Sequence, residues 1–277
     1  MRKVVDFGAF NSKELSSFLA SSSKNVAVLC DYSAIEVFKQ KHMRHAQYAF
    51  GTLCKYPTQV LILKSTSEVI KLPADRRSSP ENLIDREQTR NFPQFCTLLG
   101  NPDMSVLEQG FSKHGKARQA VEKLTPQAER LRGALTALKS GLSPQVLKAL
   151  RGNTTPLPDD FAENLGMSIL ELAMINFATL FPKQDRPPFL DALSTFWFRY
   201  SVCFYSLAIH WMIHGGHETV GTDKLRNDGI DTAYVSYATL FDGLITEDNK
   251  PREVYELAGT LIKMLSGNSD DGPFQRA

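Results

Sequence analysis

Cysteine is scarce in this chain: four residues in 277, none of them in a CxxC pair. Cys30, Cys54, Cys96 and Cys203 are widely separated, so the sequence predicts neither a zinc cluster nor a disulfide framework. Because so few scattered thiols are typical of a reducing compartment, we predict a cytoplasmic location.

Long apolar runs are also missing. The N-terminal run MRKVVDFGAF is interrupted by Asp6 before it reaches the length of a signal-peptide core. No stretch reaches the roughly 20 apolar residues of a membrane-spanning helix. The most apolar segment, FWFRYSVCFYSLAIHWMIHGG, contains Arg199 and His210 and is expected to be a buried helix. No membrane contact is therefore predicted.

Two common functional motifs are absent as well. The chain has no phosphate-binding glycine loop and no GxSxG motif, so nucleotide-binding and serine-hydrolase functions have no support. The formal net charge is only +2, and any basic surface that contacts nucleic acid must therefore be local. What remains is a sequence with the ordinary composition of a folded globular protein.

The first 72 residues alternate between strand-like and helix-like patterns, which favours an α/β fold. A helix is expected over 11–22 with Asn11 or Ser12 as its cap, and Asp31 is expected to cap the next helix. Strands are expected over 3–6, 25–30 and 59–65, with a further strand over 67–72.

Residues 73–195 show helical periodicity with Pro and Gly breaks and no convincing strand, so we interpret them as a helical insertion. Residues 1–72 and 196–277 flank it, and they are predicted to form one α/β domain with a last strand over 243–246. Within the insertion, 112–140 is locally basic and amphipathic. Such a segment can contact phosphates, although a solvated helix face is the simpler explanation.

Carboxylates lie where an α/β sheet collects functional groups, at the carboxyl ends of strands and the amino ends of helices. Asp6 ends the first strand, Asp248 follows the last one, and Glu36 lies in the helix after the second. Asp231 is expected to open a helix, with Asp228 near the same first turn. Each acid alone has an ordinary explanation, but together they would repel one another without cations. The pattern therefore predicts a divalent metal site.

The stretch DTAYVSYATLFDGLITEDNK resembles the C-terminal signature of PIN-like nuclease domains. In this signature an Asp opens a helix that carries an Ala seven residues on, and a strand ends in Thr-x-Asp. Asp231, Ala238, Thr246 and Asp248 match these positions. The stretch VVDFGAF is similar to the family's first strand with its metal-binding acid, Asp6. The stretch LCDYSAIEVFK resembles the family's next acidic element, with Glu36 as the second acid.

The resemblance implies a three-layer α/β domain with a central, mainly parallel sheet, and metal-dependent hydrolysis of phosphodiester bonds. Four acids would be catalytic and would hold one or two Mg²⁺ or Mn²⁺ ions: Asp6, Glu36, Asp231 and Asp248. Asp228 would be a fifth ligand or would support the second ion. RNA is expected as substrate more than DNA, with Lys224 and Arg226 on phosphates and Thr246 orienting a carboxylate or a metal-bound water.

Several alternatives stay open within this resemblance. An endoribonuclease of the toxin or defence type would have a protein inhibitor or a second copy of the chain as partner. A flap-type DNA nuclease is the first alternative. Asp6 is followed by Phe7 and Gly8, where the family commonly has Thr and then Asn or Ser. A catalytically inactive module for RNA binding or assembly is therefore the second alternative.

Histidines form a separate pattern. His210 and His214 stand four residues apart in the apolar segment, with His217 three residues further on. A helical pair at this spacing can bind zinc, and a zinc hydrolase is the more specific functional hypothesis for it. No Glu stands between the pair, and Gly215 and Gly216 indicate a helix end. Structural histidines, or one lining the acidic site, are the simpler explanation.

Overall fold

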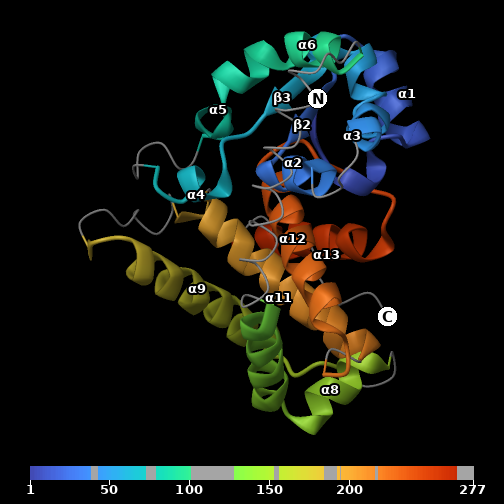
Figure 1. Ribbon diagram of the computed structural model, residues 1–277. Coiled ribbons are helices and arrows are strands. Elements are labelled where there is room, and N and C mark those ends of the chain that lie inside the picture. The colour runs from blue at the N-terminus through green and yellow to red at the C-terminus, as the bar shows by residue number, and fades with distance from the viewer. Residues whose placement is uncertain are drawn as a thin grey trace. The chain divides into compact units, whose positions relative to one another are not determined.

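The computed structural model describes residues 1–38, 43–72, 79–100, 128–152, 156–183, 192–193, 195–215 and 218–266. The chain forms two compact units (Figure 1). Unit 1 consists of Met1–Leu72, Ser79–Thr125 and Phe241–Asn249, and unit 2 of Pro73–Ser78, Pro126–Leu240 and Lys250–Ala277. The sequence-based division paired 1–72 with 196–277. In the structure, most of 196–277 groups with the helices of the middle of the chain.

Unit 1 contains a parallel sheet of four strands among its described residues, in the order β3-β2-β1-β4. The strands are β1 (Arg2–Val5), β2 (Val26–Leu29), β3 (Val60–Ile62) and β4 (Leu244–Ile245). Parallel neighbours need crossover connections, which the intervening helices provide. The predicted α/β class with a mainly parallel sheet is thus confirmed, as are the first three predicted strands and the last one.

The helices of unit 1 follow the sequence pattern closely at the start of the chain. Helix α1 (Lys13–Ser21) begins at the predicted cap, where the Ser12 hydroxyl accepts a hydrogen bond of 3.0 Å from Leu15 N. The other described helices of unit 1, apart from the short α4, are α2 (Asp31–Phe38), α3 (Met43–Ala49), α5 (Pro80–Leu83) and α6 (Arg86–Gly100), with 3-10 turns at Phe7–Ala9, Leu53–Lys55 and Pro57–Gln59. Buried side chains of α1, α2, α3 and α6 and of all four strands form one apolar cluster that includes Val5, Phe10, Leu15 and Ile245.

The predicted strand over 67–72 is wrong, because this segment begins with helix α4 (Thr66–Val69). Ser65 and Glu68 form a capping box, in which the Glu68 carboxylate accepts a hydrogen bond of 2.9 Å from Ser65 N. This local pairing satisfies the first backbone donors of a helix, and it favours a helix over the strand predicted for this segment.

One disulfide joins Cys54 to Cys96, whose Cα atoms lie 5.3 Å apart. The expectation that the cysteines form no disulfide is therefore wrong for this pair, while Cys30 and Cys203 are free and buried. The partners are 42 residues apart, and only the packing of α6 brings them together. Disulfides persist mainly in oxidising compartments, so this bond does not favour the cytoplasmic location, which stays a prediction.

Unit 2 is helical throughout its described residues. It contains a helix over 128–141 and helices α8 (Pro144–Arg151), α9 (Phe161–Leu180), α11 (Phe196–His214), α12 (Thr222–Ala238) and α13 (Asn249–Leu265). Helix α11 packs against α8, α9 and α12 (Figure 1), which confirms the buried helix predicted for this apolar segment. None of the helices in the described ranges combines the length and apolar character that a membrane crossing requires. Of the basic segment, 128–140 is helical and 112–127 lies outside the described residues.

Helix α12 begins earlier than predicted. Gly221 is its N-cap and Thr222 its first residue, so Asp231 lies in the helix interior and does not open it. Asp228 likewise lies beyond the first turn. The charged, glycine-containing run before Asp231 obscured the helix, because Gly229 inside a helix costs about 1 kcal/mol relative to Ala. Burial of Leu225, Ile230 and their neighbours supplies the compensating stabilisation.

Candidate functional site

Two strand ends of unit 1 bring Asp6 and Asp248 to the same edge of the sheet. Strands β1 and β4 are parallel neighbours with Val5 opposite Ile245, and Asp6 N donates a hydrogen bond of 3.0 Å to Ile245 O. The Thr246 hydroxyl donates to Asp6 Oδ2 at 3.0 Å and accepts from Asp248 N at 3.2 Å. Thr246 therefore links the two acids by direct hydrogen bonds.

The electrostatics of this edge oppose a free negative charge on Asp6. The Asp6 side chain is buried, and this desolvation raises its pKa above the ordinary value. The hydrogen bond from Thr246 opposes the shift, whereas the nearby charge of Asp248 adds to it. Asp248 itself is exposed. A cation between the two carboxylates would offset both the desolvation and the repulsion.

Glu36 is the third predicted site acid that lies in unit 1. It lies half-buried on α2, the helix that directly follows β2, the neighbour of β1 in the sheet. The carboxylate oxygens of Asp6, Glu36 and Asp248 do not all lie within 4.8 Å of one another. Among the described residues, one group of potential ligands in unit 2 is that compact. A metal ion bound by these acids would therefore be held partly through water.

Asp31, the expected helix cap, has a structural role. It is the first residue of α2, and its carboxylate accepts hydrogen bonds from Thr66 N at 2.7 Å, from the Thr66 hydroxyl at 2.9 Å and from Tyr32 N at 3.1 Å. Burial raises the pKa of Asp31, against the effect of these bonds. The residue thus fastens the start of α2 to the start of α4.

A cavity of about 610 Å³ opens beside Asp31, at the carboxyl ends of β2 and β3. Its walls are mainly apolar and include Phe38, Phe50 and Phe92, while Ser65 is among its polar groups. Ligands of parallel α/β sheets commonly bind at this end of the strands. The cavity has no acidic side chain other than Asp31 among its described lining residues.

In unit 2, Asp228 is engaged by other side chains. Its buried carboxylate accepts a hydrogen bond of 3.0 Å from Trp211 Nε1 and lies 2.5 Å from Lys250 Nζ. The Lys250 ammonium also lies 4.5 Å from the centre of the Trp211 ring. Lys250 already neutralises the carboxylate, so we leave Asp228 out of the proposed ligand set.

The remaining predicted residues of unit 2 lie on α12. Asp231 is half-buried, one turn after Asp228. The Lys224 ammonium is 5.7 Å from the centre of the Trp211 ring, and Arg226 pairs with Asp223 at 2.8 Å. Of the predicted site, Asp6, Glu36, Thr246 and Asp248 thus belong to unit 1, and Asp228, Asp231, Lys224 and Arg226 to unit 2.

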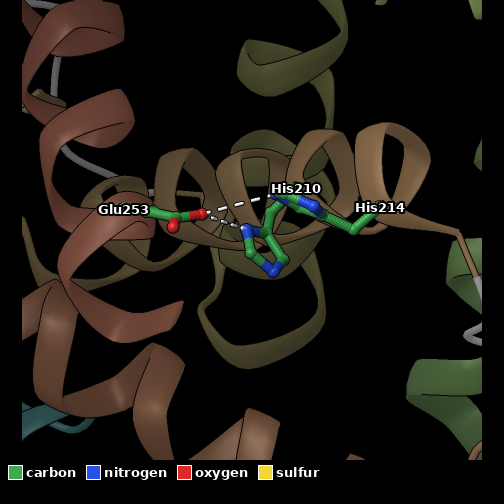
Figure 2. A group of neighbouring side chains, drawn as sticks. All are labelled: His210, His214 and Glu253. Atoms are coloured by element: carbon green, nitrogen blue, oxygen red, sulfur yellow. Dashed lines mark ion pairs between the residues drawn. The ribbon is translucent and has the colours of Figure 1, made fainter. Parts of the chain in front are cut away.

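Unit 2 also holds a compact group of metal-ligand side chains, His210, His214 and Glu253, whose ligand atoms all lie within 4.8 Å of one another. His210 Nδ1 is 3.0 Å and His214 Nε2 is 3.5 Å from the same oxygen, Glu253 Oε2 (Figure 2). The histidines come from the last turns of α11 and the acid from α13. Inspection of the sequence around the pair missed Glu253 because the acid lies on another helix.

Burial is the main cause that lowers the pKa of His210 below its ordinary value. The neighbouring His214 and Lys250 act in the same direction, and Glu253 opposes them. A lowered pKa keeps the imidazole neutral at physiological pH, the form that binds metal ions. His217, the third histidine of the pattern, lies outside the described residues.

A comparison of the chain with protein-family models, with curated proteins and with solved structures finds no match. Function is therefore inferred from the side chains and their geometry, together with the resemblance of the short motifs. Among the described residues, two places offer metal-ligand side chains: the edge of the sheet at Asp6 and Asp248, with oxygen atoms, and the group at His210, His214 and Glu253, with nitrogen and oxygen atoms.

Proposed function

We propose that the protein is a PIN-like nuclease that uses Mg²⁺ or Mn²⁺ to hydrolyse phosphodiester bonds, with RNA as the preferred substrate. One observation carries the proposal: Asp6 and Asp248 follow neighbouring parallel strands, and Thr246 joins them. The resemblance of these same positions to the Thr-x-Asp and first-acid motifs of PIN-like domains supports it. Glu36, on α2 of the same unit, is the further proposed acid, and Asp231 of unit 2 stays a prediction from the motif alone.

The donor set fits a hard divalent ion. Mg²⁺ usually keeps several waters and takes only one or two protein carboxylates, so an edge with two linked acids is sufficient. Asp6 and Asp248 would bind the ion, and Glu36 would act through its water. When bound, such an ion lowers the pKa of its water and stabilises charge on the phosphate.

The residues of the edge have separate tasks in this scheme. Thr246 fixes Asp6 Oδ2 through its hydroxyl and so positions the Asp6 carboxylate. Asp248 is exposed and can reach a substrate phosphate through the bound ion. Lys224, which is exposed on α12, stays a predicted phosphate contact. Arg226 is the weaker candidate because its guanidinium already pairs with Asp223.

Cleavage assays test the proposal. Purified protein is incubated with Mn²⁺ or Mg²⁺ and with end-labelled single-stranded RNA and DNA of the same sequence. We expect RNA cleavage that EDTA abolishes, and a loss of more than about 100-fold in Asp6→Asn and Asp248→Asn, since even outer-shell changes at metal sites cost about 10- to 100-fold. Glu247→Gln is the matched control, because Glu247 is exposed and adjoins Asp248 without belonging to the ligand set.

Two results would overturn the enzymatic assignment: no cleavage of either nucleic acid with either metal ion, or full activity in Asp6→Asn. DNA cleavage without RNA cleavage would instead favour the flap-type alternative. Calorimetry with Mn²⁺ separates loss of metal binding from loss of chemistry in each variant.

A second candidate function, a non-catalytic RNA-binding or assembly module, rests on the residue after Asp6. Phe7 begins a 3-10 turn, and its ring packs 5.6 Å from Phe10 and 6.0 Å from His45, centre to centre. No hydroxyl or amide is therefore offered by this residue to a metal-bound water. RNA binding that needs no divalent ion, with no cleavage, would support this function.

A further inference from the structure

We propose that His210, His214 and Glu253 form a Zn²⁺ site in unit 2, separate in its residues and in its chemistry from the acidic edge of unit 1. The three side chains are drawn together in Figure 2, where both imidazole rings lie beside the carboxylate of Glu253. The site binds a transition metal ion through two nitrogens and one oxygen, and it joins α11 to α13.

The geometry of the group fits zinc without rearrangement of the helices. Bonds of about 2.0–2.2 Å in a tetrahedral site place neighbouring ligand atoms roughly 3.3 Å apart. The distances from Glu253 Oε2 are 3.0 Å to His210 Nδ1 and 3.5 Å to His214 Nε2, on either side of that value. The ring centres of the two histidines are 4.4 Å apart. Small side-chain rotations are enough to admit an ion between the three atoms.

The helix positions explain why the group forms. Residues four apart lie on one face of a helix, so His210 and His214 point the same way near the end of α11. Gly215 ends the helix directly after His214 with a positive φ of 73°. Glu253, in the second turn of α13, reaches the same point from the other side.

Charge around the group permits a divalent cation. The ligand set carries one negative charge from Glu253 when both imidazoles are neutral. The ammonium group of Lys250 acts on His210, but it is paired with the buried carboxylate of Asp228 at 2.5 Å and lies over Trp211. Its repulsion of a bound ion is therefore largely offset within the same unit.

The donor types select among metal ions. Imidazole suits zinc and other late transition ions, whereas Mg²⁺ and Mn²⁺ prefer carboxylate, carbonyl and water. Two histidines and one glutamate leave a fourth tetrahedral position for water. His214 and Glu253 have side chains that are 55% and 50% exposed, so water and metal ions can reach that position from solvent.

Zinc titration of the full chain, with any affinity tag removed and metals stripped, tests the site by a readout other than nuclease activity. Calorimetry is expected to show one Zn²⁺ ion per chain. His214→Ala and Glu253→Gln are each expected to weaken Zn²⁺ binding about 10- to 100-fold or more. Glu256→Gln, the same change one turn later on α13, is the control and is expected to leave the affinity within twofold.

Co²⁺ provides a second measurement. The wild-type protein loaded with Co²⁺ is expected to show the visible absorption of a tetrahedral ion, and His214→Ala is expected to lose it. Because both ligand positions are exposed, their substitution is expected to leave the fold intact, which circular dichroism checks. Mn²⁺ binding, which the proposed nuclease site requires, is expected to be unchanged in His214→Ala.

The proposal is overturned if the wild-type chain binds no Zn²⁺, or if binding is equally strong in His214→Ala and Glu253→Gln. In either case the three side chains form only a hydrogen-bonded contact between histidine and glutamate. Because neither result depends on RNA cleavage, failure here is distinct from failure of the nuclease assignment.

Discussion

The ammonium group of Lys250 lies 2.5 Å from the buried carboxylate of Asp228. The two residues come from α13 and α12, and Trp211 of α11 contacts both of them, as hydrogen-bond donor to Asp228 and as the ring beneath Lys250. Three helices of unit 2 therefore meet at one buried charge pair. This relationship explains why an acid that the sequence offers as a metal ligand is held inside unit 2.

Breaking this pair is expected to destabilise the protein markedly. Lys250→Met leaves the Asp228 carboxylate buried with only the Trp211 N–H as a described partner, and we expect a loss of roughly 2–4 kcal/mol in the free energy of unfolding. The value allows for the partial exposure of Lys250. Urea denaturation followed by circular dichroism measures it. The control is Arg226→Met, which breaks the pair with exposed Asp223 and should cost less than about 1 kcal/mol.

Thr246 offers a test of how Asp6 is held. Thr246→Val keeps the size and branching of the side chain but removes the hydroxyl that donates to Asp6 Oδ2 and accepts from Asp248 N. We expect Mn²⁺ affinity, measured by calorimetry, to fall about tenfold or more. Thr246→Ser restores the hydroxyl and should recover most of the affinity. Equal losses in the Val and Ser variants would contradict a positioning role and indicate a packing defect.

The strands and the acids at their ends were predictable because their signals are local. A short apolar run ending in Asp6 and another ending at Thr246 are visible without knowledge of the fold, and a parallel sheet then brings them to one edge. The cap at Ser12 was predictable for the same reason. Local patterns failed where a competing local signal was stronger, as at Ser65 and Glu68.

Contacts between distant helices could not be predicted from spacing. Asp228 meets Lys250 22 residues away, and Cys54 meets Cys96 across 42 residues. Glu253 joins the two histidines from a different helix, so a search for an acid between them finds nothing. In each case packing, and not a sequence pattern, selects the partner.

The disulfide gives a prediction about unit 1. Its closure of a loop with a sequence separation of 42 restricts the unfolded chain, which by the loop-entropy relation corresponds to about 4 kcal/mol of stability. We expect dithiothreitol to lower the free energy of unfolding by an amount of this order. The Cys54→Ser, Cys96→Ser double variant should be destabilised to the same degree and should no longer respond to the reductant. A wild-type protein whose stability is unchanged by dithiothreitol would contradict the bond.

The end of α11 gives the last prediction, because Gly215 has φ 73° and ψ 175°. This extended conformation with positive φ is essentially restricted to glycine, and Gly215→Ala should cost about 1–3 kcal/mol although a Cβ would meet no atom of the described, non-adjacent residues within 4 Å. Gly215→Asn should cost as much, since asparagine tolerates a left-handed helical turn but not this conformation. Gly141→Ala, at a described glycine with equally open space and no positive φ, is the control and should be neutral or stabilising in the same thermal unfolding assay. A neutral Gly215→Ala would contradict a backbone constraint at Gly215, directly after His214. The Zn²⁺ affinity of that variant should then equal that of the wild-type chain.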